Sequence, residues 1–432
     1  MPKYVHDTPF IIEPEDNFLE KFPHLRQSSR YLAMRYAHRE LVTDEHLTAI
    51  GSKLWKALDI DDRFEQAQGK CGTAILPIVI KSKSAAVQSL PWETLCHPKY
   101  GFLGKEARFT LSRQFTDANS PAPLEKGPLR ILLFTSLPDD LNPETDRLNV
   151  EEEQAQMQEA LMPWIGEGLV DLKMPDDGRF STLKALLKSY EPHLLFLSGH
   201  GHFKDGKLRE TDSYGEFVFE SEKGKSAPVR DEDIAAAFIG SNIQGVILSA
   251  CESSKASSDA LTDGLSQKLS LRGIPHVIGM RESVFDEAGI QFAQALSAAF
   301  AEGERIDVAL QEARLAIEKP FEDEGASRRA GALNPNAELG YGQWSLPMLI
   351  SGMPDRALID WNFEKESKKK TITSKTLESI SLPPRFIGRR TEMRNYKSQL
   401  FDGKLKNLLI TGAGGQGKTS LAGKLAQDLQ AD

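Results

Sequence analysis

The chain reads HLLFLSGHGH at residues 193–202 and GVILSACES at residues 245–253. Each segment is a short apolar run that passes through small residues and ends in a chemically reactive side chain. Such runs are typical of strands that are buried on both faces of a parallel sheet. Catalytic and binding groups gather beyond the carboxyl ends of parallel strands. His200 and Cys251 each follow such an end, so the two segments predict one shared site.

The same pattern continues on both sides of these segments, as short apolar runs alternating with helical periodicity. The predicted strands are Arg130–Phe134, His193–Ser198, Gly245–Ala250, His276–Met280 and Trp344–Ile350. The predicted helices are Glu151–Leu161, Ser181–Tyr190, Ser258–Leu271, Phe285–Phe300 and Ile306–Ile317. This alternation predicts an α/β fold with a mostly parallel sheet and helices on both faces. Pro347 predicts an edge or bulged position for the last strand.

Composition divides the chain into four parts. Residues 1–70 are charged and include a helical pattern at Thr43–Leu58, which predicts an N-terminal helical segment. Residues 71–353 form the α/β domain, and residues 354–384, with three consecutive lysines and a Pro-Pro pair, have linker composition. Residues 385–432 begin another unit, with a predicted strand at Leu408–Thr411 and a helix at Lys418–Leu429.

The overall composition excludes several classes of protein. Of 432 residues, 40% are hydrophobic and 27% are charged, which argues against intrinsic disorder. The net charge of −9 argues against a nucleic-acid partner. No apolar run is long enough for a membrane span or a signal peptide, and three cysteines make no disulfide framework. We therefore expect a cytoplasmic protein without a membrane partner.

The two reactive side chains suit nucleophilic catalysis. A cysteine attacks as a thiolate and needs a base beside it. If the two strands are neighbours, His200 and Cys251 emerge on the same rim, within hydrogen-bond reach. The N–H groups of Gly201 and Cys251 suit an oxyanion hole. Gly199 and Gly201 would let a substrate peptide approach the backbone closely.

The residues alone leave other readings open. His202 competes with His200, because it lies two residues further on and points to the same side in an extended segment. Isolated cysteines and histidines are more often structural, and we interpret five residues in this way: Cys71, Cys96, His97, His193 and His276. The spacing of cysteine, histidine and carboxylate residues favours no metal site.

A second motif, GAGGQGKT at residues 412–419, follows a predicted strand and opens a predicted helix. It fits the phosphate-binding P-loop, whose backbone N–H groups cradle the phosphates of ATP. The expected nucleotide-binding residues are Gly412, Gly414, Gly415, Gly417, Lys418 and Thr419. Lys418 would reach the phosphates and Thr419 would coordinate Mg²⁺. The chain ends soon after this helix, so we expect an incomplete NTPase that hydrolyses no nucleotide by itself.

Seven segments, in this order and spacing, resemble a CHAT domain of the caspase-like cysteine peptidase clan, which includes separases. They are Leu90–Glu93 with Gly101–Leu103, Leu129–Ser136 with Glu151–Glu153, Ser198–Gly201, Leu248–Glu252 and Gly273–Gly279. The resemblance spans residues 71–352 and implies a caspase-like fold with a His200–Cys251 dyad. It also implies hydrolysis of peptide bonds through a thioester and without a metal or other cofactor.

Arg385–Arg390 resembles the opening motif of STAND-type signalling ATPases. The whole architecture is similar to that of bacterial immune effectors in antiviral defence, in which a sensor oligomerises and releases a protease. This resemblance implies a protein substrate, either the chain itself or a product encoded nearby, and an oligomer that needs the complete NTPase and sensor. One alternative is an inactive caspase-fold docking module of an ATP-driven oligomer. Another is a switch whose only chemistry is ATP binding.

The substrate preference is less readable from the sequence. Related metacaspases often carry an aspartate two residues before the cysteine, where this chain has Ser249. Asp139, Asp140 and Asp286 remain as acidic candidates for a specificity pocket. The segment from Lys204 to Asp231 is expected to form a hairpin that covers the site as a movable flap.

Overall fold

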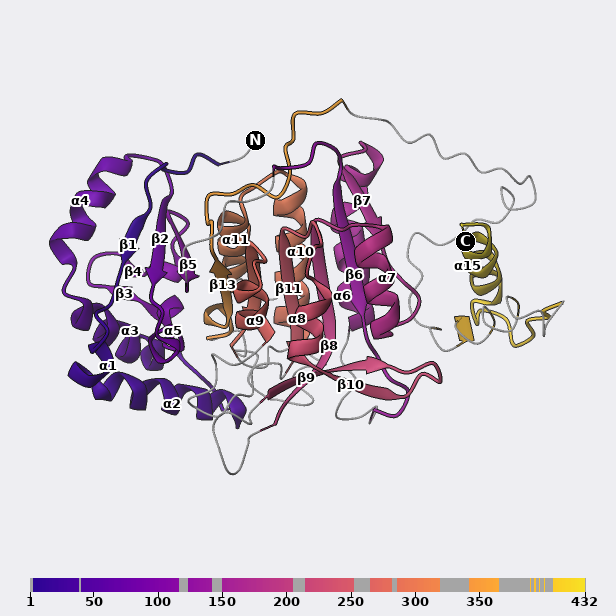
Figure 1. Ribbon diagram of the computed structural model, residues 1–432, viewed down its shortest axis with the longest axis horizontal. Coiled ribbons are helices and arrows are strands. Elements are labelled where there is room, and N and C mark those ends of the chain that lie inside the picture. Colours follow the sequence, from indigo (N-terminus) through magenta and orange to yellow (C-terminus); the bar gives the residue numbers. More distant parts are fainter. Residues whose placement is uncertain are drawn as a thin grey trace.

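An eleven-stranded sheet forms the centre of this computed structural model (Figure 1). The structure describes residues 3–38, 40–115, 123–141, 150–204, 214–251, 265–281, 286–318, 342–364 and 407–431, with Arg389, Glu392, Met393, Tyr396 and Leu400. The strands along the sheet are β1 (Phe10–Ile12), β2 (Leu76–Lys81), β5 (Phe109–Gln114), β13 (Pro347–Ser351), β12 (His276–Met280), β11 (Gly245–Cys251), β8 (Leu194–Lys204), β6 (Leu129–Thr135) and β7 (Val170–Lys173). The strands β9 (Tyr214–Glu220) and β10 (Ser226–Arg230) extend it beside β8.

Most neighbouring strands of the sheet are parallel, as the sequence predicts. The block β12–β11–β8–β6–β7 is parallel throughout, and so is the block β1–β2–β5. The strand β13 is antiparallel to β12 and meets β5 at a single residue pair, Ile350 and Arg113. A separate two-stranded ribbon pairs β3 (Cys96–His97) with β4 (Gly101–Phe102).

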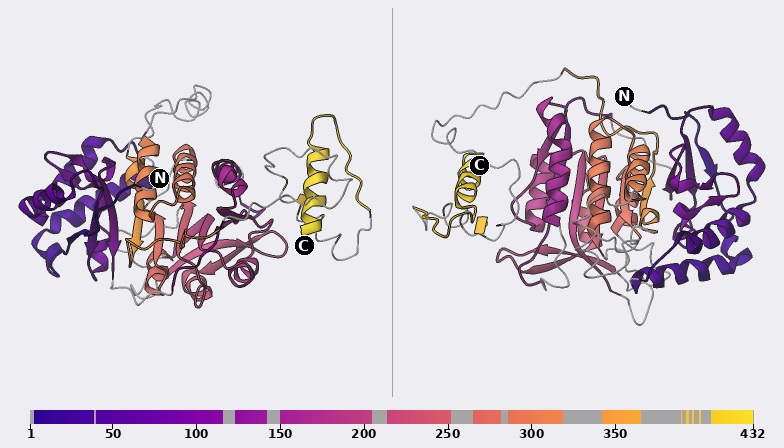
Figure 2. Two further views of the ribbon diagram at one scale, coloured as in Figure 1. Left: turned by 90° about the horizontal axis from the view of Figure 1, so that it is seen from above. Right: turned by 180° about the vertical axis from the view of Figure 1, so that it is seen from behind.

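Helices cover both faces of the sheet (Figure 2). One face carries α6 (Val150–Gly166), α10 (Asp286–Ala301) and α11 (Ile306–Glu318), and the other carries α7 (Phe180–Ser189), α8 (Asp231–Ala237) and α9 (Leu265–Leu271). Alternate strand residues enter the two layers, since side chains on a strand point to opposite faces. Ile247 and Phe196 pack under the first set, whereas Val246 and Leu195 pack under the second. The central strands are therefore buried on both sides.

The N-terminal helices pack on the same core as the rest of the chain. They are α1 (Phe18–Lys21), α2 (Pro23–Ala37), α3 (Asp44–Leu58) and α4 (Asp61–Cys71), followed by the short α5 (Ala85–Gln88) and the 3₁₀ turns η1 (Trp92–Thr94) and η2 (Leu103–Lys105). The ring of Phe64 lies 5.0 Å from that of Trp55 and 5.5 Å from that of Phe109. Because β1 also joins the sheet, residues before 71 share one core with those after it.

Four sequence expectations need correction. The linker expected from residue 354 begins too early, because Leu358 and Ile359 are buried in the main core. The last strand lies inside the sheet rather than at its edge, since Pro347 is its first residue and a proline there removes few ladder hydrogen bonds. Before it, Trp344 belongs to a 3₁₀ turn, η4 (Gln343–Ser345). Residues 408–411 form no strand, and no described strand pairs with them.

The remaining helical expectations agree with the structure or fall partly outside it. The predicted helix after the P-loop is confirmed as α15 (Lys418–Ala431). The predicted helix at Ser258–Leu271 is described only from Leu265 onward. None of the helices in the described ranges combines the length and apolarity that a bilayer span needs.

Two helical glycines give a matched test of the packing of α3. A Cβ atom at Gly51 would overlap the carbonyl oxygen of Thr94, whereas a Cβ at Gly69 in α4 meets nothing within 4 Å. We expect Gly51→Ala to lower the free energy of unfolding by about 1–3 kcal/mol through overpacking. Gly69→Ala is expected to raise it by about 0.5–1 kcal/mol, because alanine favours a helix. Urea unfolding of both variants checks this, and equal effects would contradict the packing of α3 on η1.

Candidate functional site

The structure places His200 and Cys251 opposite each other on neighbouring strands. The strands β8 and β11 pair in parallel without interruption, from Leu194 with Gly245 to His200 with Cys251. Adjacent strands lie about 4.8 Å apart, and residues in register share one face of the sheet. The side chain of Cys251 lies outside the described part of the structure, so the register concerns its backbone.

His200 lies where β8 changes its partner on the side away from β11. The strand β6 accompanies β8 only as far as the pair of Thr135 and Ser198, and β9 takes over with the pair of Val218 and His200. His200 therefore has a strand on each side, and its side chain is 8% exposed. The backbone of His202 pairs with Glu216, but its side chain is outside the described part.

The segment expected to act as a flap is built into the sheet instead. The hairpin of β9 and β10 forms as predicted, but β9 pairs with β8, and Phe217 and Phe219 are buried in the core. The Ser136 hydroxyl donates to the Val218 carbonyl at 2.7 Å. The Leu137 N–H donates to the Glu220 carboxylate at 3.0 Å. These contacts attach β9 to the end of β6, whereas residues 205–213 lie outside the described ranges.

Gly199 has a packing role that the sequence did not indicate. A Cβ atom at this position would lie 2.6 Å from the Phe217 ring and 3.1 Å from the Ser136 carbonyl oxygen. The glycine therefore lets β9 close over β8. Gly201, the expected oxyanion-hole residue, pairs with Phe217 in the register of β8 and β9.

Asp231, which is not among the residues predicted from the sequence, joins the elements around the site. Its carboxylate accepts a hydrogen bond from the N–H of Gly215 in β9 at 2.9 Å and another from the N–H of Glu232 at 2.8 Å. The Lys268 ammonium of α9 approaches the same carboxylate at 2.8 Å. Because the Asp231 side chain is buried, these contacts tie β9, α8 and α9 together, and α9 is the first described helix after Cys251.

The acidic candidates for a specificity pocket have other partners or lie outside the description. Asp140 accepts hydrogen bonds from the N–H and the hydroxyl of Ser226, both at 2.8 Å, and these bonds hold its pKa below the usual value. The N–H of Asp139 donates to the Gly224 carbonyl at 2.8 Å. Both residues therefore fasten the end of β6 to the hairpin. The side chain of Asp286 is outside the described part.

The three histidines interpreted as structural from the sequence are all buried. His276 is fully buried beside the Ser351 hydroxyl at 2.9 Å, and burial lowers its pKa to about 3. Burial also lowers the pKa of His97 and of His193. Burial raises the pKa of the Cys71 and Cys96 thiols. Within the described ranges, no three histidine, cysteine or carboxylate side chains cluster as metal ligands.

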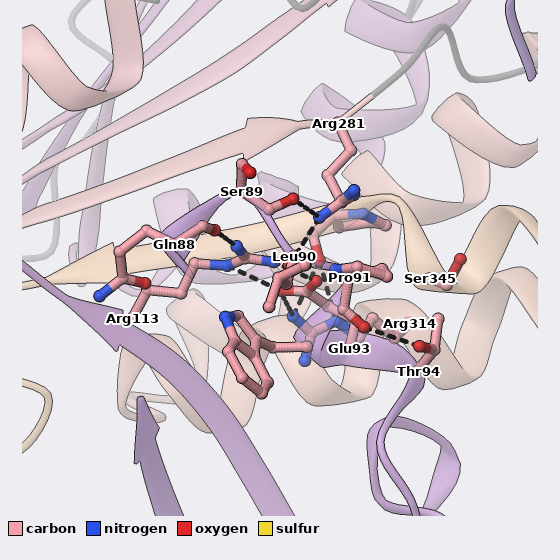
Figure 3. A network of polar contacts seen from close by, with 12 residues as sticks. Gln88, Ser89, Leu90, Pro91, Glu93, Thr94, Arg113, Arg281, Arg314 and Ser345 are labelled. Atoms are coloured by element: carbon pink, nitrogen blue, oxygen red, sulfur yellow. Dashed lines mark hydrogen bonds and ion pairs between the residues drawn. The ribbon is translucent and has the colours of Figure 1, made fainter. Parts of the chain in front are cut away.

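A buried charge network lies beside the end of β12 (Figure 3). Glu93, from the Leu90–Glu93 motif, receives the Arg113 guanidinium of β5 through two nitrogens, Nε at 3.2 Å and Nη2. The Arg314 guanidinium of α11 lies 3.9 Å from the same carboxylate. The side chains of all three residues are at most 2% exposed, so the network is shielded from water.

Arg281 extends this network to the edge of the sheet that carries His200. It follows β12 directly, and its Nη1 donates to the carbonyls of Ser89 at 3.0 Å and Leu90 at 2.8 Å. Burial alone raises the pKa of Glu93, but Arg113, Arg314 and Arg281 act against it and hold the pKa below the usual value. Burial lowers the pKa of Arg314 to about 10. In the sequence, the only sign of this network is the position of Arg314 next to the apolar stripe of α11.

The P-loop residues form a turn that leads directly into α15. Gly415 and Gly417 have φ values of 79° and 72°, in the left-handed region that favours glycine. The Lys418 ammonium donates to the Ala413 carbonyl at 2.6 Å, and the Arg389 guanidinium donates to the Gln416 carbonyl at 3.1 Å. Residues 411–417 are exposed, so their backbone is accessible to a ligand.

Comparison with family models gives one match over most of the chain. The model described as "CHAT domain" matches residues 44–363. A comparison with curated proteins found no match.

Solved structures add three distant likenesses. A chain of the Saccharomyces cerevisiae separase–securin complex is 16% identical over 64% of this chain, with a TM-score of 0.36. The match covers 15% of that chain, so this protein corresponds to a small part of it. The Arg-specific cysteine proteinase gingipain R is 7% identical over 81% of this chain and 78% of its own, with a TM-score of 0.41. The Drosophila initiator caspase Dronc is 11% identical over 49% of this chain and 87% of its own, with a TM-score of 0.29.

The role of Asp231 can be tested with a neighbour on the same helix. Asp231→Asn removes the charge that Lys268 faces and one of the buried acceptors, so we expect a loss of about 2–3 kcal/mol in the free energy of unfolding. Asp233→Asn changes an exposed side chain of the same type and is expected to stay within about 0.5 kcal/mol of the parent. Urea unfolding measures both variants. An unchanged free energy of unfolding in Asp231→Asn would contradict the role of Asp231 in joining β9, α8 and α9.

Proposed function

The chain belongs to the CHAT family, and from this premise we propose that it is a cysteine endopeptidase that cleaves protein substrates with Cys251 and His200. The observation that carries the proposal is the strand register, in which the Cα atoms of these two residues are partners. Two residues of complementary chemistry thus meet at the carboxyl ends of neighbouring parallel strands, where catalytic groups of α/β sheets gather.

The proposed reaction proceeds in two steps. His200 takes the proton of the Cys251 thiol, and the thiolate attacks the carbonyl carbon of the scissile peptide bond. His200 then gives this proton to the leaving amine, which releases one product and leaves a thioester on Cys251. Water, deprotonated by His200, hydrolyses the thioester and restores the thiol. The backbone N–H groups of Gly201 and Cys251 are the proposed donors to the oxyanion.

The packing around His200 supports this role for it. A general base must keep a fixed position relative to its nucleophile, because small displacements cost much of the rate. The backbone of His200 is paired to β11 on one side and to β9 on the other, and β9 is fastened by Ser136 and Asp231. These contacts hold the imidazole-bearing strand at the level of Cys251.

A labelling experiment tests the dyad. We expect a peptide acyloxymethyl ketone to alkylate Cys251, and His200→Ala to slow this reaction by about 10²-fold or more, the usual contribution of a catalytic base. His202→Ala, two residues further on, is the matched control and should label at nearly the parental rate. Intact-protein mass spectrometry of each variant, with Cys251→Ser as the blank, gives the rates.

The outcome separates the peptidase from the main alternative. Equal rates of Cys251 alkylation in the parent and in His200→Ala would contradict the proposed dyad. It would favour a catalytically inactive docking module of an ATP-driven oligomer. Loss of labelling in His202→Ala but not in His200→Ala would move the base to His202.

We also propose that the P-loop binds ATP and Mg²⁺ and that a STAND-type NTPase module regulates the peptidase. The accessible loop and the position of Lys418 at the start of α15 support it. Gly412, Gly414, Gly415 and Gly417 would cradle the phosphates, with Lys418 on the phosphates and Thr419 on Mg²⁺. The proposed setting is a cytoplasmic immune effector whose substrate is a protein, including itself or a neighbouring-gene product, and whose oligomer needs the complete NTPase and sensor.

Nucleotide binding has its own test. We expect a fluorescent ATP analogue with Mg²⁺ to bind the chain, and Lys418→Ala to weaken this binding at least about tenfold, the loss expected for one charge-assisted contact to phosphate. Lys424→Ala, on the same helix, is the control. Fluorescence anisotropy measures both, and unchanged binding in Lys418→Ala would remove the P-loop from the proposal.

A further inference from the structure

The helix α2 carries positive charge and no negative charge. Its sequence, Pro23–Ala37, contains Arg26, Arg30 and Arg35 but no aspartate or glutamate. The chain as a whole has a net charge of −9. A cationic helix on an anionic protein creates a local surface that attracts negative charge.

One stripe of α2 packs on the core, and the opposite stripe faces the solvent. Residues three and four apart on a helix share a face. The buried stripe consists of Leu25, Ser29, Leu32 and Tyr36. The same spacing unites four exposed side chains on the opposite face, those of Gln27, Tyr31, Met34 and His38.

The exposed stripe has the composition of a protein interface. Tyr31 and Met34 are 52% and 62% exposed. At 3.6 residues per turn, Arg26 and Arg30 lie on one side of this pair and Arg35 lies on the other. The buried centres of protein interfaces are enriched in aromatic residues, methionine and arginine, and they are depleted in aspartate and glutamate.

Arg35 and Tyr31 are ordered by each other. The Arg35 guanidinium donates to the Tyr31 hydroxyl at 2.8 Å and lies 5.6 Å from the centre of its ring. Side chains that are ordered before binding lose less entropy when a partner arrives. Arg35 also donates to the Leu41 carbonyl at 2.9 Å and forms an ion pair at 3.3 Å with Glu40, which is half exposed. Because exposed ion pairs contribute little, a carboxylate of a partner can replace Glu40 at a small cost.

The C-terminal end of α2 lies at the same edge of the sheet as Cys251. The Tyr36 hydroxyl donates to the Gly342 carbonyl at 2.8 Å, directly before η4. The chain then enters β13, whose Pro347 pairs with Met280 at the carboxyl end of β12. Figure 1 shows α2 along the lower edge of the molecule, where β9 also lies.

The distance from the site to this helix is within the reach of an extended polypeptide. Two strand spacings of about 4.8 Å separate β11 from β13, which makes about 10 Å across the sheet. The helix continues for about 20 Å at 1.5 Å per residue. An extended segment of about ten residues, at about 3.3 Å each, therefore spans both distances.

We infer that the exposed face of α2 is a docking surface for an acidic segment of the protein substrate, outside the residues that enter the site. The inference rests on the proposed peptidase function and adds an element of substrate recognition to it. Carboxylates of the segment pair with Arg26 and Arg35, and an apolar side chain packs on Tyr31 and Met34. A long phosphate polymer fits this surface less well, because the net charge of the chain repels it.

Two fluorescent peptides test the chemistry of the surface. One is a short peptide of glutamate, leucine and glycine, and the other has glutamine in place of each glutamate. Both are titrated into Cys251→Ser, which cannot cleave them, and into the same protein with Arg26→Glu or Lys53→Glu added. Lys53 is exposed on the neighbouring helix α3, so its variant controls for the change in net charge. Fluorescence anisotropy gives the affinities.

We expect the glutamate peptide to bind Cys251→Ser at least about tenfold more tightly than the glutamine peptide, the factor of one charge-assisted contact. Arg26→Glu should abolish this preference, and Lys53→Glu should keep it. Equal binding of the two peptides, or equal loss in Arg26→Glu and Lys53→Glu, would overturn the docking surface and leave the peptidase standing.

Cleavage of native proteins tests whether the bound segment belongs to the substrate. The parent, Arg26→Glu and Lys53→Glu are each incubated with an undigested proteome, and new N-termini are mapped by mass spectrometry. We expect Arg26→Glu alone to reduce, by about tenfold, the cuts that have an acidic segment within about ten residues. Unchanged cuts in Arg26→Glu would overturn the substrate as the occupant. Absence of cleavage together with labelling of Cys251 that ignores His200 would overturn the peptidase as well.

Discussion

The register between β8 and β11 is the constraint on which the site depends. Seven consecutive residue pairs, ending with His200 and Cys251, hold the two strands in step. Both faces of these strands are buried under helices, so a slip by one residue would exchange Ile247 and Val246 between two filled cores. Such a slip turns every side chain of a strand to the other face. The apolar packing of the strand interior therefore determines which residue stands opposite Cys251 at the strand end.

The sheet would end at Ser198 on one side of β8 if β9 did not continue it. The hairpin of β9 and β10 takes the place of β6 at the level of His200, and Gly199 allows the Phe217 ring to lie against the strand. Asp231 then links this hairpin to α9 beyond the Cys251 strand. Residues that are distant in sequence thus hold the end of β8 from outside. A site at the end of a sheet gains rigidity from such contacts.

Much of the fold could be predicted from local sequence, and the reasons are physical. The central strands are short apolar runs because both faces are buried, and their spacing indicates parallel crossovers. The edge position predicted from Pro347 was wrong because this proline is the first residue of its strand. A proline in the middle of a strand removes a hydrogen bond of the sheet. The strand expected at residues 408–411 has no described partner, and pairing cannot be read from propensity alone. Similarly, the residues around Glu93 in the sequence give no indication that its carboxylate lies beside Arg314 in the fold.

The Glu93 network also joins four elements of the fold that are distant in sequence. A buried carboxylate or guanidinium without its partner is strongly unfavourable, whereas the assembled network satisfies each group. Its members come from η1, β5, the end of β12 and α11, so they meet only when η1 and β5 have assembled with α11 and with the strand next to that of Cys251. Folding of one part without the other would leave charges buried alone. The family match from residue 44 to residue 363 includes every member of this network, as expected for elements that must assemble as one unit.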